Sequence, residues 1–343
     1  MQKFLIFFSL SFLVIACKNE SKETQKAYIS FEGKTMGTYY KITYDDSLGR
    51  NLQEEVERLL IEINDEVSTY IPTSTISQFN QSEMGIDVNG KAHFLGNFLK
   101  AREVCAQSGG AFDPTVMPLV NYWGFGYTEK KPVTQVDSMK IDSLIAFVGM
   151  DKVSLDEGFL KKIKPSVQLD FSGIATGYAI DTLGGLLEAK GIKNYLVDIG
   201  GEQRARGVNA HGAIWNIGIN VPKEGAPKNE IQATVELKDW TISTSGNYRN
   251  FYDANGVKYS HTINPKTGFP ERNTLLSASV FSENCITADA WATAFMVMGI
   301  DKAYEMATQL PEVEAYFIYG TPDGGMSVKY TSELASLFEK GRE

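Results

Sequence analysis

Residues 170–201 read DFSGIATGYAIDTLGGLLEAKGIKNYLVDIGG, and this segment gives the clearest indication of the fold. Residues 173–190 are predicted to form a helix that begins with small residues and ends at Gly191, because glycine terminates helices well. Residues 195–199 follow as a short apolar run, which is typical of a buried strand. We therefore expect a helix and a buried strand joined by a short connection.

Helices and strands alternate on both sides of this segment. Further helices are predicted at residues 52–66, 94–108 and 288–298. A strand or hairpin is predicted at residues 31–44, and further strands at residues 215–221, 231–237 and 275–281. The helix at residues 52–66 places Val56, Leu59, Leu60 and Ile63 on one face. Because the order lacks a regular βαβ spacing, it favours the α+β class over a doubly wound sheet. No linker or repeat divides the chain, so we expect one large domain at residues 31–343.

The first residues predict export and a lipid anchor. After Lys3, an apolar run at residues 4–15 leads into VIAC at residues 14–17, which is too short to span a bilayer and resembles a bacterial lipobox. We expect a signal peptide at residues 1–16, a lipid on Cys17, and a flexible tether to residue 30. An ordinary secretory signal with a chance cysteine is the alternative.

Composition excludes some classes of partner and site. The formal net charge is −9, and loss of residues 1–16 with Lys3 changes it to −10, which argues against nucleic-acid binding. The apolar share of 43% is ample for a core. Besides Cys17 the chain has only Cys105 and Cys285, without CxxC spacing, so neither a zinc site nor a redox pair is indicated. We expect two buried free thiols, with a disulfide between them as the alternative.

Two segments carry the candidate chemistry. Residues 242–268, ISTSGNYRNFYDANGVKYSHTINPKTG, place His261 in a turn-rich region. Asp289 and Thr293 lie four apart on a predicted helix, hence on one face, and offer oxygen ligands suited to Mg²⁺; partnership of the aspartate with the helix dipole is the alternative. Small residues at 172–177 allow backbone groups to approach a phosphate or a cation, or allow close helix packing. No G-x-G-x-x-G fingerprint and no P-loop occurs.

Nine ordered motifs resemble those of the ApbE family of FAD:protein FMN transferases. They are KTMGTY at residues 34–39, STY at 68–70 with FN at 79–80, GAFDP at 110–114, YWGFG at 122–126, the segment 170–181, DIGG at 198–201, STSGNYRNFY at 243–252, SHTINPKTG at 260–268 and TADAWAT at 287–293. The resemblance covers residues 34–329, which is essentially the whole expected domain.

This resemblance implies a single α+β domain with mixed sheets, helices packed on them and a flavin-binding cleft. It also implies a Mg²⁺-dependent enzyme. Such an enzyme cuts the pyrophosphate of FAD and moves FMN onto a serine or, typically, a threonine hydroxyl of another protein, with release of AMP. Family acceptors are flavin-bearing subunits of membrane redox complexes. The family is commonly anchored by a lipid on the periplasmic side of a bacterial membrane, with the inner membrane favoured over the outer one.

The resemblance also assigns roles residue by residue. His261 is the expected base that takes the acceptor proton, since a hydroxyl is a poor nucleophile at neutral pH. The expected Mg²⁺ ligands are the side chains of Asp289 and Thr293 and the backbone carbonyl of Gly173. The expected FAD contacts are Met36, Tyr70, Ala111, Phe112, Asp113, Thr176 and Ile263. Thr176 stands where the family commonly has lysine or glutamate, so a charged contact to the ligand is missing.

Three other functions remain open from the sequence. The first is an FAD pyrophosphatase, in which water replaces the protein hydroxyl and FMN and AMP are both released. The second is a lipoprotein that binds FAD without catalysis, for which a base such as His261 has no use. The third is a lipid-anchored structural domain without a small ligand.

Overall fold

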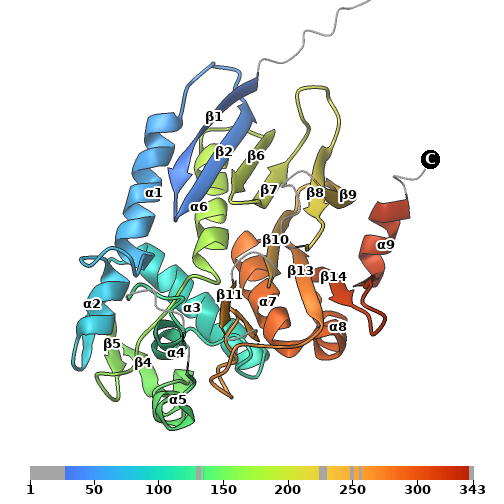
Figure 1. Ribbon diagram of the computed structural model, residues 1–343. Helices are drawn as coiled ribbons and strands as arrows, with labels where there is room; N and C mark the ends of the chain where they lie inside the picture. Colours follow the sequence, from blue (N-terminus) through green and yellow to red (C-terminus); the bar gives the residue numbers. More distant parts are fainter. Residues whose placement is uncertain are drawn as a thin grey trace, which may run out of the picture.

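The computed structural model describes residues 28–128, 133, 135–223, 230–247, 251–254 and 257–339 (Figure 1). The predicted signal peptide, Cys17 and most of the tether lie outside these residues, as do residues 248–250 of the motif at 243–252. Within the described part of the chain, no helix combines the length and the apolar character that a membrane span requires.

An eight-stranded sheet forms the centre of the domain, with the order β1-β2-β6-β7-β10-β13-β14-β15. Its strands are β1 (Tyr28–Thr35), β2 (Thr38–Asp45), β6 (Tyr195–Ile199), β7 (Glu202–Arg206), β10 (Thr241–Gly246), β13 (Leu275–Ser282), β14 (Glu314–Gly320) and β15 (Met326–Tyr330). We expected mixed sheets. In this sheet all ladders between neighbouring strands are antiparallel. Antiparallel pairing with interspersed helices confirms the α+β class.

Helices cover one face of this sheet (Figure 1). They are α1 (Gln53–Val67), α3 (Ala92–Gln107), α6 (Ala175–Ala189), α7 (Cys285–Met298) and α8 (Ile300–Ala307). α7 packs on β10 and β13 and against α6, and Trp291 and Phe295 of α7 are fully buried. The main hydrophobic core therefore lies between the sheet and this helical layer.

The opposite face of the sheet is covered by a two-stranded ribbon and the last helix. The ribbon pairs β8 (Trp215–Asn220) with β9 (Ile231–Leu237), and α9 (Ser332–Glu339) packs on β9 and β14. Here Ile217 and Val235 of the ribbon belong to a second apolar cluster with Phe281 and Ile318 of the sheet. The second face is thus covered over the β13–β14 part of the sheet, whereas alternate residues of β1 and β2 are exposed.

Shorter elements lie at the lower end of the view in Figure 1. They are α2 (Thr75–Gln81), α4 (Met117–Tyr122), α5 (Ser138–Ile145), the three-stranded sheet of β3 (Gly85–Asp87), β5 (Phe159–Lys162) and β4 (Val153–Asp156), and the hairpin of β11 (Phe251–Ala254) and β12 (Val257–Ser260). A third apolar cluster includes Trp123 and Ile141 together with Tyr259 and Ile263. This cluster fixes the segment around His261 to the rest of the domain.

Most predicted elements are present, with shifted ends. The strand or hairpin expected at residues 31–44 is the β1–β2 hairpin, and residues 28–30, expected in the tether, belong to β1. α7 begins at Cys285 rather than at residue 288, so Asp289 lies in the second turn and not at the helix start. Cys105 and Cys285 are free and buried, which confirms the expected thiols.

Lys162 is a buried cation that joins α2 to the loop before residue 170. Its Nζ atom donates to the carbonyls of Phe79 (2.8 Å), Asn80 (3.3 Å), Pro165 (3.0 Å) and Val167 (3.1 Å). Only 6% of this lysine is exposed. The α2 end and the loop therefore depend on one ammonium group.

Replacing Lys162 with methionine should destabilise the protein by about 2–4 kcal/mol, because several buried carbonyls lose their donor. Urea unfolding of the two proteins measures this difference. Lys161→Met, at the exposed neighbouring position of β5, is the matched control and should change stability by less than about 0.5 kcal/mol. Equal midpoints for Lys162→Met and the parent protein would contradict the assigned role.

Candidate functional site

A cavity of about 480 Å³ lies where several distant segments meet, and it contains most of the predicted site residues. Its lining includes Tyr70, Ala111, Phe112, Asp113, Gly173, His261, Ile263, Asp289 and Thr293. Met36 and Thr176 are not among the lining residues. Met36 sits at the tip of the β1–β2 hairpin with φ 48° and packs on the main core, whereas Thr176 is half-buried in the first turn of α6. Their contacts with FAD stay predictions.

The segment that carries His261 is held on its N-terminal side by aromatic packing. Tyr259, at the end of β12, stacks on Trp123 with 5.3 Å between ring centroids, and Tyr252 of β11 stacks on Tyr259 at 5.4 Å. The ring of His261 then lies edge-on to Phe125 at 6.4 Å. These contacts hold the histidine at the cavity wall.

A tight turn holds the same segment on its C-terminal side. The Asn264 side-chain oxygen accepts hydrogen bonds from the N–H groups of Lys266 (2.8 Å) and Thr267 (3.3 Å), which is the local pattern that makes asparagine a turn residue. Gly268 ends the turn with φ 74°, and its carbonyl accepts a hydrogen bond from the Trp123 indole at 2.8 Å. His261 is therefore placed by a fixed loop, as suits a catalytic group.

Residues 111–113 reach the cavity because α3 ends in two consecutive glycines. Gly109 (φ 59°) and Gly110 (φ 81°) adopt a left-handed backbone, which turns the chain sharply after the helix. The N–H of Phe112 then donates to Ser108 Oγ at 3.1 Å. Asp113 Oδ1 accepts from both the N–H (2.8 Å) and the hydroxyl (2.6 Å) of Thr115, and burial raises the pKa of Asp113.

The three predicted cation ligands lie next to one another. Asp289 and Thr293 are on the same face of α7, as their spacing predicts, and both line the cavity. A Cβ atom on Gly173 would stand 2.9 Å from Thr293 Oγ1, so the Gly173 backbone adjoins the threonine hydroxyl. Ser245 Oγ of β10 lies 3.4 Å from the same hydroxyl oxygen. The Asp289 carboxylate, the hydroxyls of Thr293 and Ser245, and the Gly173 backbone thus line the same cavity.

Glu202 is a carboxylate of this site that the sequence analysis missed. It begins β7, directly after the DIGG motif, and lines the cavity with Asp289. Its Oε2 atom is buried and has no hydrogen-bond partner among the residues that the structure describes. Burial and the nearby charge of Asp289 raise the pKa of Glu202. In the sequence, only the position of Glu202 directly after the DIGG motif indicated that it could belong to the site.

Asp170 is a second missed carboxylate at the cavity. Its Oδ1 atom accepts a hydrogen bond from the N–H of Ser172 at 2.8 Å, and burial raises its pKa. The side chain lies close enough to Tyr70 for its charge to raise the pKa of that tyrosine, after burial as the larger cause. Asp170 opens the small-residue segment at 170–181, so its place in the motif was visible while its burial was not.

The donor set fits a divalent cation. Carboxylate, hydroxyl and carbonyl oxygens are the hard ligands that Mg²⁺ prefers, and the unsatisfied Glu202 oxygen is a further carboxyl oxygen at the same cavity. Among the described residues, no group of three or more His, Cys, Asp or Glu side chains forms a metal site. The residues that would hold a cation here are Asp289 and Thr293, through their side chains, and Gly173, through its backbone carbonyl.

Burial, with a smaller contribution from Asp181, raises the pKa of Asp289 to about 7. In metal-free protein, folded molecules therefore hold this proton between about pH 4 and pH 7, while unfolded chains release it. Raising the pH from 5 to 8 in EDTA should lower the free energy of unfolding of the parent protein. The decrease should exceed that of Asp289→Asn, which has no such proton, by about 2–4 kcal/mol. Urea unfolding of both proteins at the two pH values tests this, and parallel pH profiles would contradict it.

Comparison with known proteins places the chain beside flavin transferases. The ApbE family model matches residues 36–317. The FAD:protein FMN transferase of Vibrio cholerae serotype O1 is 35% identical over 328 residues, covering 94% of this chain and 96% of that protein. The protein of the same name from Haemophilus influenzae is 35% identical over 345 residues, covering 98% and 97%.

Solved structures agree with these relatives. The flavin transferase ApbE from Vibrio cholerae superposes with a TM-score of 0.81 at 34% identity, covering 91% of this chain and 99% of that one. The apo form of the Pseudomonas stutzeri flavinyl transferase ApbE gives a TM-score of 0.80 at 33% identity, covering 91% and 97%.

Proposed function

Because the chain belongs to the ApbE family, we propose that it is an FAD:protein FMN transferase. The observation that carries this proposal is the convergence of His261, Asp289, Thr293 and the Gly173 backbone on one cavity. A base and a set of oxygen ligands in one cleft are what transfer of a phosphate-linked group to a hydroxyl requires.

FAD is the substrate that we place in this cleft. Phe112 and Ile263 offer apolar surface for the isoalloxazine or adenine faces, and Tyr70, which is 62% exposed, offers an aromatic ring at the cavity edge. Asp113 has a carboxyl group that can accept a hydrogen bond from a ring or ribose group of the ligand.

His261 acts as the general base. Its ring takes the proton from the acceptor hydroxyl, which is a threonine or serine side chain of another protein. The hydroxyl oxygen then bonds to the phosphorus of the FMN half of FAD, and the bond from that phosphorus to the bridging oxygen breaks. AMP leaves with that oxygen, and FMN stays on the acceptor as a phosphoester.

Asp289, Thr293 and the Gly173 carbonyl would hold the cation. Bound Mg²⁺ supplies neutralisation of the negative charge that builds on the pyrophosphate during transfer. Glu202 stands next to Asp289 and adds a carboxylate to the cation side of the cleft.

The remaining parts of the proposal concern location and partner. Cleavage before Cys17 and lipid attachment there would anchor the domain on the periplasmic side of a bacterial membrane, with the inner membrane favoured. The acceptor is then a flavin-carrying subunit of a membrane redox complex. The lipobox-like sequence at residues 14–17 supports this location.

Incubation of the purified protein with FAD, Mg²⁺ and such a subunit tests the function. We expect flavin fluorescence on the denatured acceptor in a gel, and its loss with EDTA. FMN and AMP in solution without a labelled acceptor would identify a pyrophosphatase instead. Retention of intact FAD without turnover would identify a binding protein.

A further inference from the structure

We infer that Asp181 is a positioning residue for the cation site: from α6 it fixes the N-terminus of α7, and so it sets where Asp289 and Thr293 stand relative to the Gly173 backbone. The inference rests on the proposed function, because it takes these three residues as the Mg²⁺ ligands. Asp181 itself does not line the cavity, so it acts through α7.

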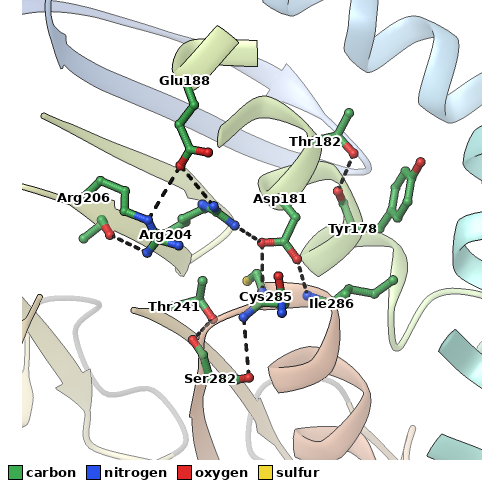
Figure 2. A network of polar contacts seen from close by, with 12 residues as sticks. Tyr178, Asp181, Thr182, Glu188, Arg204, Arg206, Thr241, Ser282, Cys285 and Ile286 are labelled. Atoms are coloured by element: carbon green, nitrogen blue, oxygen red, sulfur yellow. Dashed lines mark hydrogen bonds and ion pairs between the residues drawn. The ribbon is translucent and has the colours of Figure 1, made fainter. Parts of the chain in front are cut away.

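The carboxylate of Asp181 caps α7 from outside that helix. Its Oδ1 accepts the N–H of Cys285 and its Oδ2 the N–H of Ile286, both at 2.9 Å (Figure 2). Within the described part of the chain, the side chain of Asn284, the N-cap residue, makes no capping hydrogen bond. Free amides and a partial positive charge at a helix start favour a carboxylate there. The first turn of α7 is therefore held by a residue 104 positions away in the sequence.

A second contact between a carboxylate and an amide joins the same two helices, with the carboxylate on α7 and the amide on α6. Asp289 Oδ2 of α7 accepts the N–H of Gly177 in α6 at 3.0 Å. Gly177 lies one turn before Asp181, and Asp289 lies one turn after Cys285. A Cβ atom on Gly177 would stand 2.4 Å from the Cys285 carbonyl oxygen, so the two helices touch at this point. The two contacts lock α6 and α7 in one relative position.

Arg204 of β7 holds Asp181 in place. Its Nη1 lies 2.7 Å from Asp181 Oδ1 and its Nη2 donates to Glu188 at 3.1 Å (Figure 2). Its Nε donates to the Tyr195 hydroxyl at 3.0 Å. Burial raises the pKa of Asp181, whereas Arg204 and the α7 amides lower it and favour the charged form. A planar guanidinium with several partners fixes the carboxylate in orientation as well as in charge.

This arrangement matters because the proposed ligands come from two sides of the α6–α7 contact. Gly173 lies just before α6, whereas Asp289 and Thr293 lie on α7. Mg²⁺ requires near-ideal octahedral geometry at short distances, so a small shift of α7 against α6 weakens binding. Groups that orient metal ligands without touching the metal commonly change metal affinity by about 10–100-fold when replaced.

Asp181→Asn tests the inference, with Glu188→Gln as the matched control. Both variants replace a carboxylate that pairs with Arg204, but of the two residues Asp181 is the one that holds α7. Electron paramagnetic resonance of Mn²⁺, as a probe for the divalent site, measures binding directly in the full-length protein. We expect affinity about tenfold weaker in Asp181→Asn and within about twofold of the parent in Glu188→Gln. Excess Mg²⁺ should restore much of the transfer rate of Asp181→Asn, since the catalytic groups are intact.

The outcomes separate this inference from the proposed function. No Mn²⁺ binding by the parent protein would contradict the proposed cation site itself. Binding by the parent and equal binding by folded Asp181→Asn would contradict the positioning role alone, as would an equal loss in both variants. If Asp181→Asn does not fold, Asp181→Glu keeps the charge and displaces the cap by one methylene. Parent-like Mn²⁺ affinity in Asp181→Glu would then overturn the inference.

Discussion

His261→Ala should transfer FMN about a hundredfold to ten-thousandfold more slowly than the parent protein while it still binds FAD. The alanine removes the group that we propose takes the acceptor proton, so the hydroxyl would have no base to activate it. FAD binding is retained because the proposed contacts from Tyr70, Phe112 and Ile263 are untouched. Because the Asn264 turn and the packing of Tyr259 hold the segment on both sides, the variant should fold normally.

The measurement compares single-turnover labelling of an acceptor with FAD affinity from fluorescence quenching. His211→Ala is the control, because His211 is exposed and does not line the cavity, and it should behave like the parent in both assays. A transfer rate in His261→Ala equal to that of the parent protein would refute the role of this histidine as base.

Asp289→Asn should lose Mg²⁺-dependent transfer by about a hundredfold or more, since charge stabilisation at a reacting centre typically contributes that much. Asparagine is chosen because its side-chain oxygen can still accept the hydrogen bond from the Gly177 N–H, which alanine cannot. The substitution thus removes the charge of the carboxylate and preserves the contact between α6 and α7.

Initial rates across a range of Mg²⁺ concentrations, with EDTA as the zero point, measure this effect. Asp301→Asn, at an exposed aspartate in the first turn of α8, is the control and should keep the parent's Mg²⁺ dependence. If Asp289→Asn in EDTA works as fast as the parent protein with Mg²⁺, the proposed metal site is wrong.

Elements with a strong apolar pattern could be predicted from the sequence. The helix at 94–108 and the strand at 195–199 are present within two residues of the expected ends, as α3 and β6. The common face of Asp289 and Thr293 follows from helical periodicity alone, and α7 bears it out. Local pattern is sufficient here because burial on one face determines the spacing of residues.

The strands that border the cleft could not be predicted in this way. β10 (TISTSG) and β7 (EQRAR) are central strands, yet both are polar because Ser245 and Glu202 face the cavity and Arg204 faces Asp181. In these strands, polar residues of the site stand where apolar residues would alternate, so the pattern that predicts a strand is absent. The pairing of Asp181 with α7 is equally invisible, since no local pattern joins positions 104 residues apart.

The cap that α6 places on α7 also bears on the order of events during synthesis. Asp181 is made long before Cys285 and Ile286, and its partner amides do not exist until those residues have been added. The cleft also takes its Asp289 and Thr293 walls from the same late helix. A growing chain therefore cannot form the complete cleft until α7 has docked.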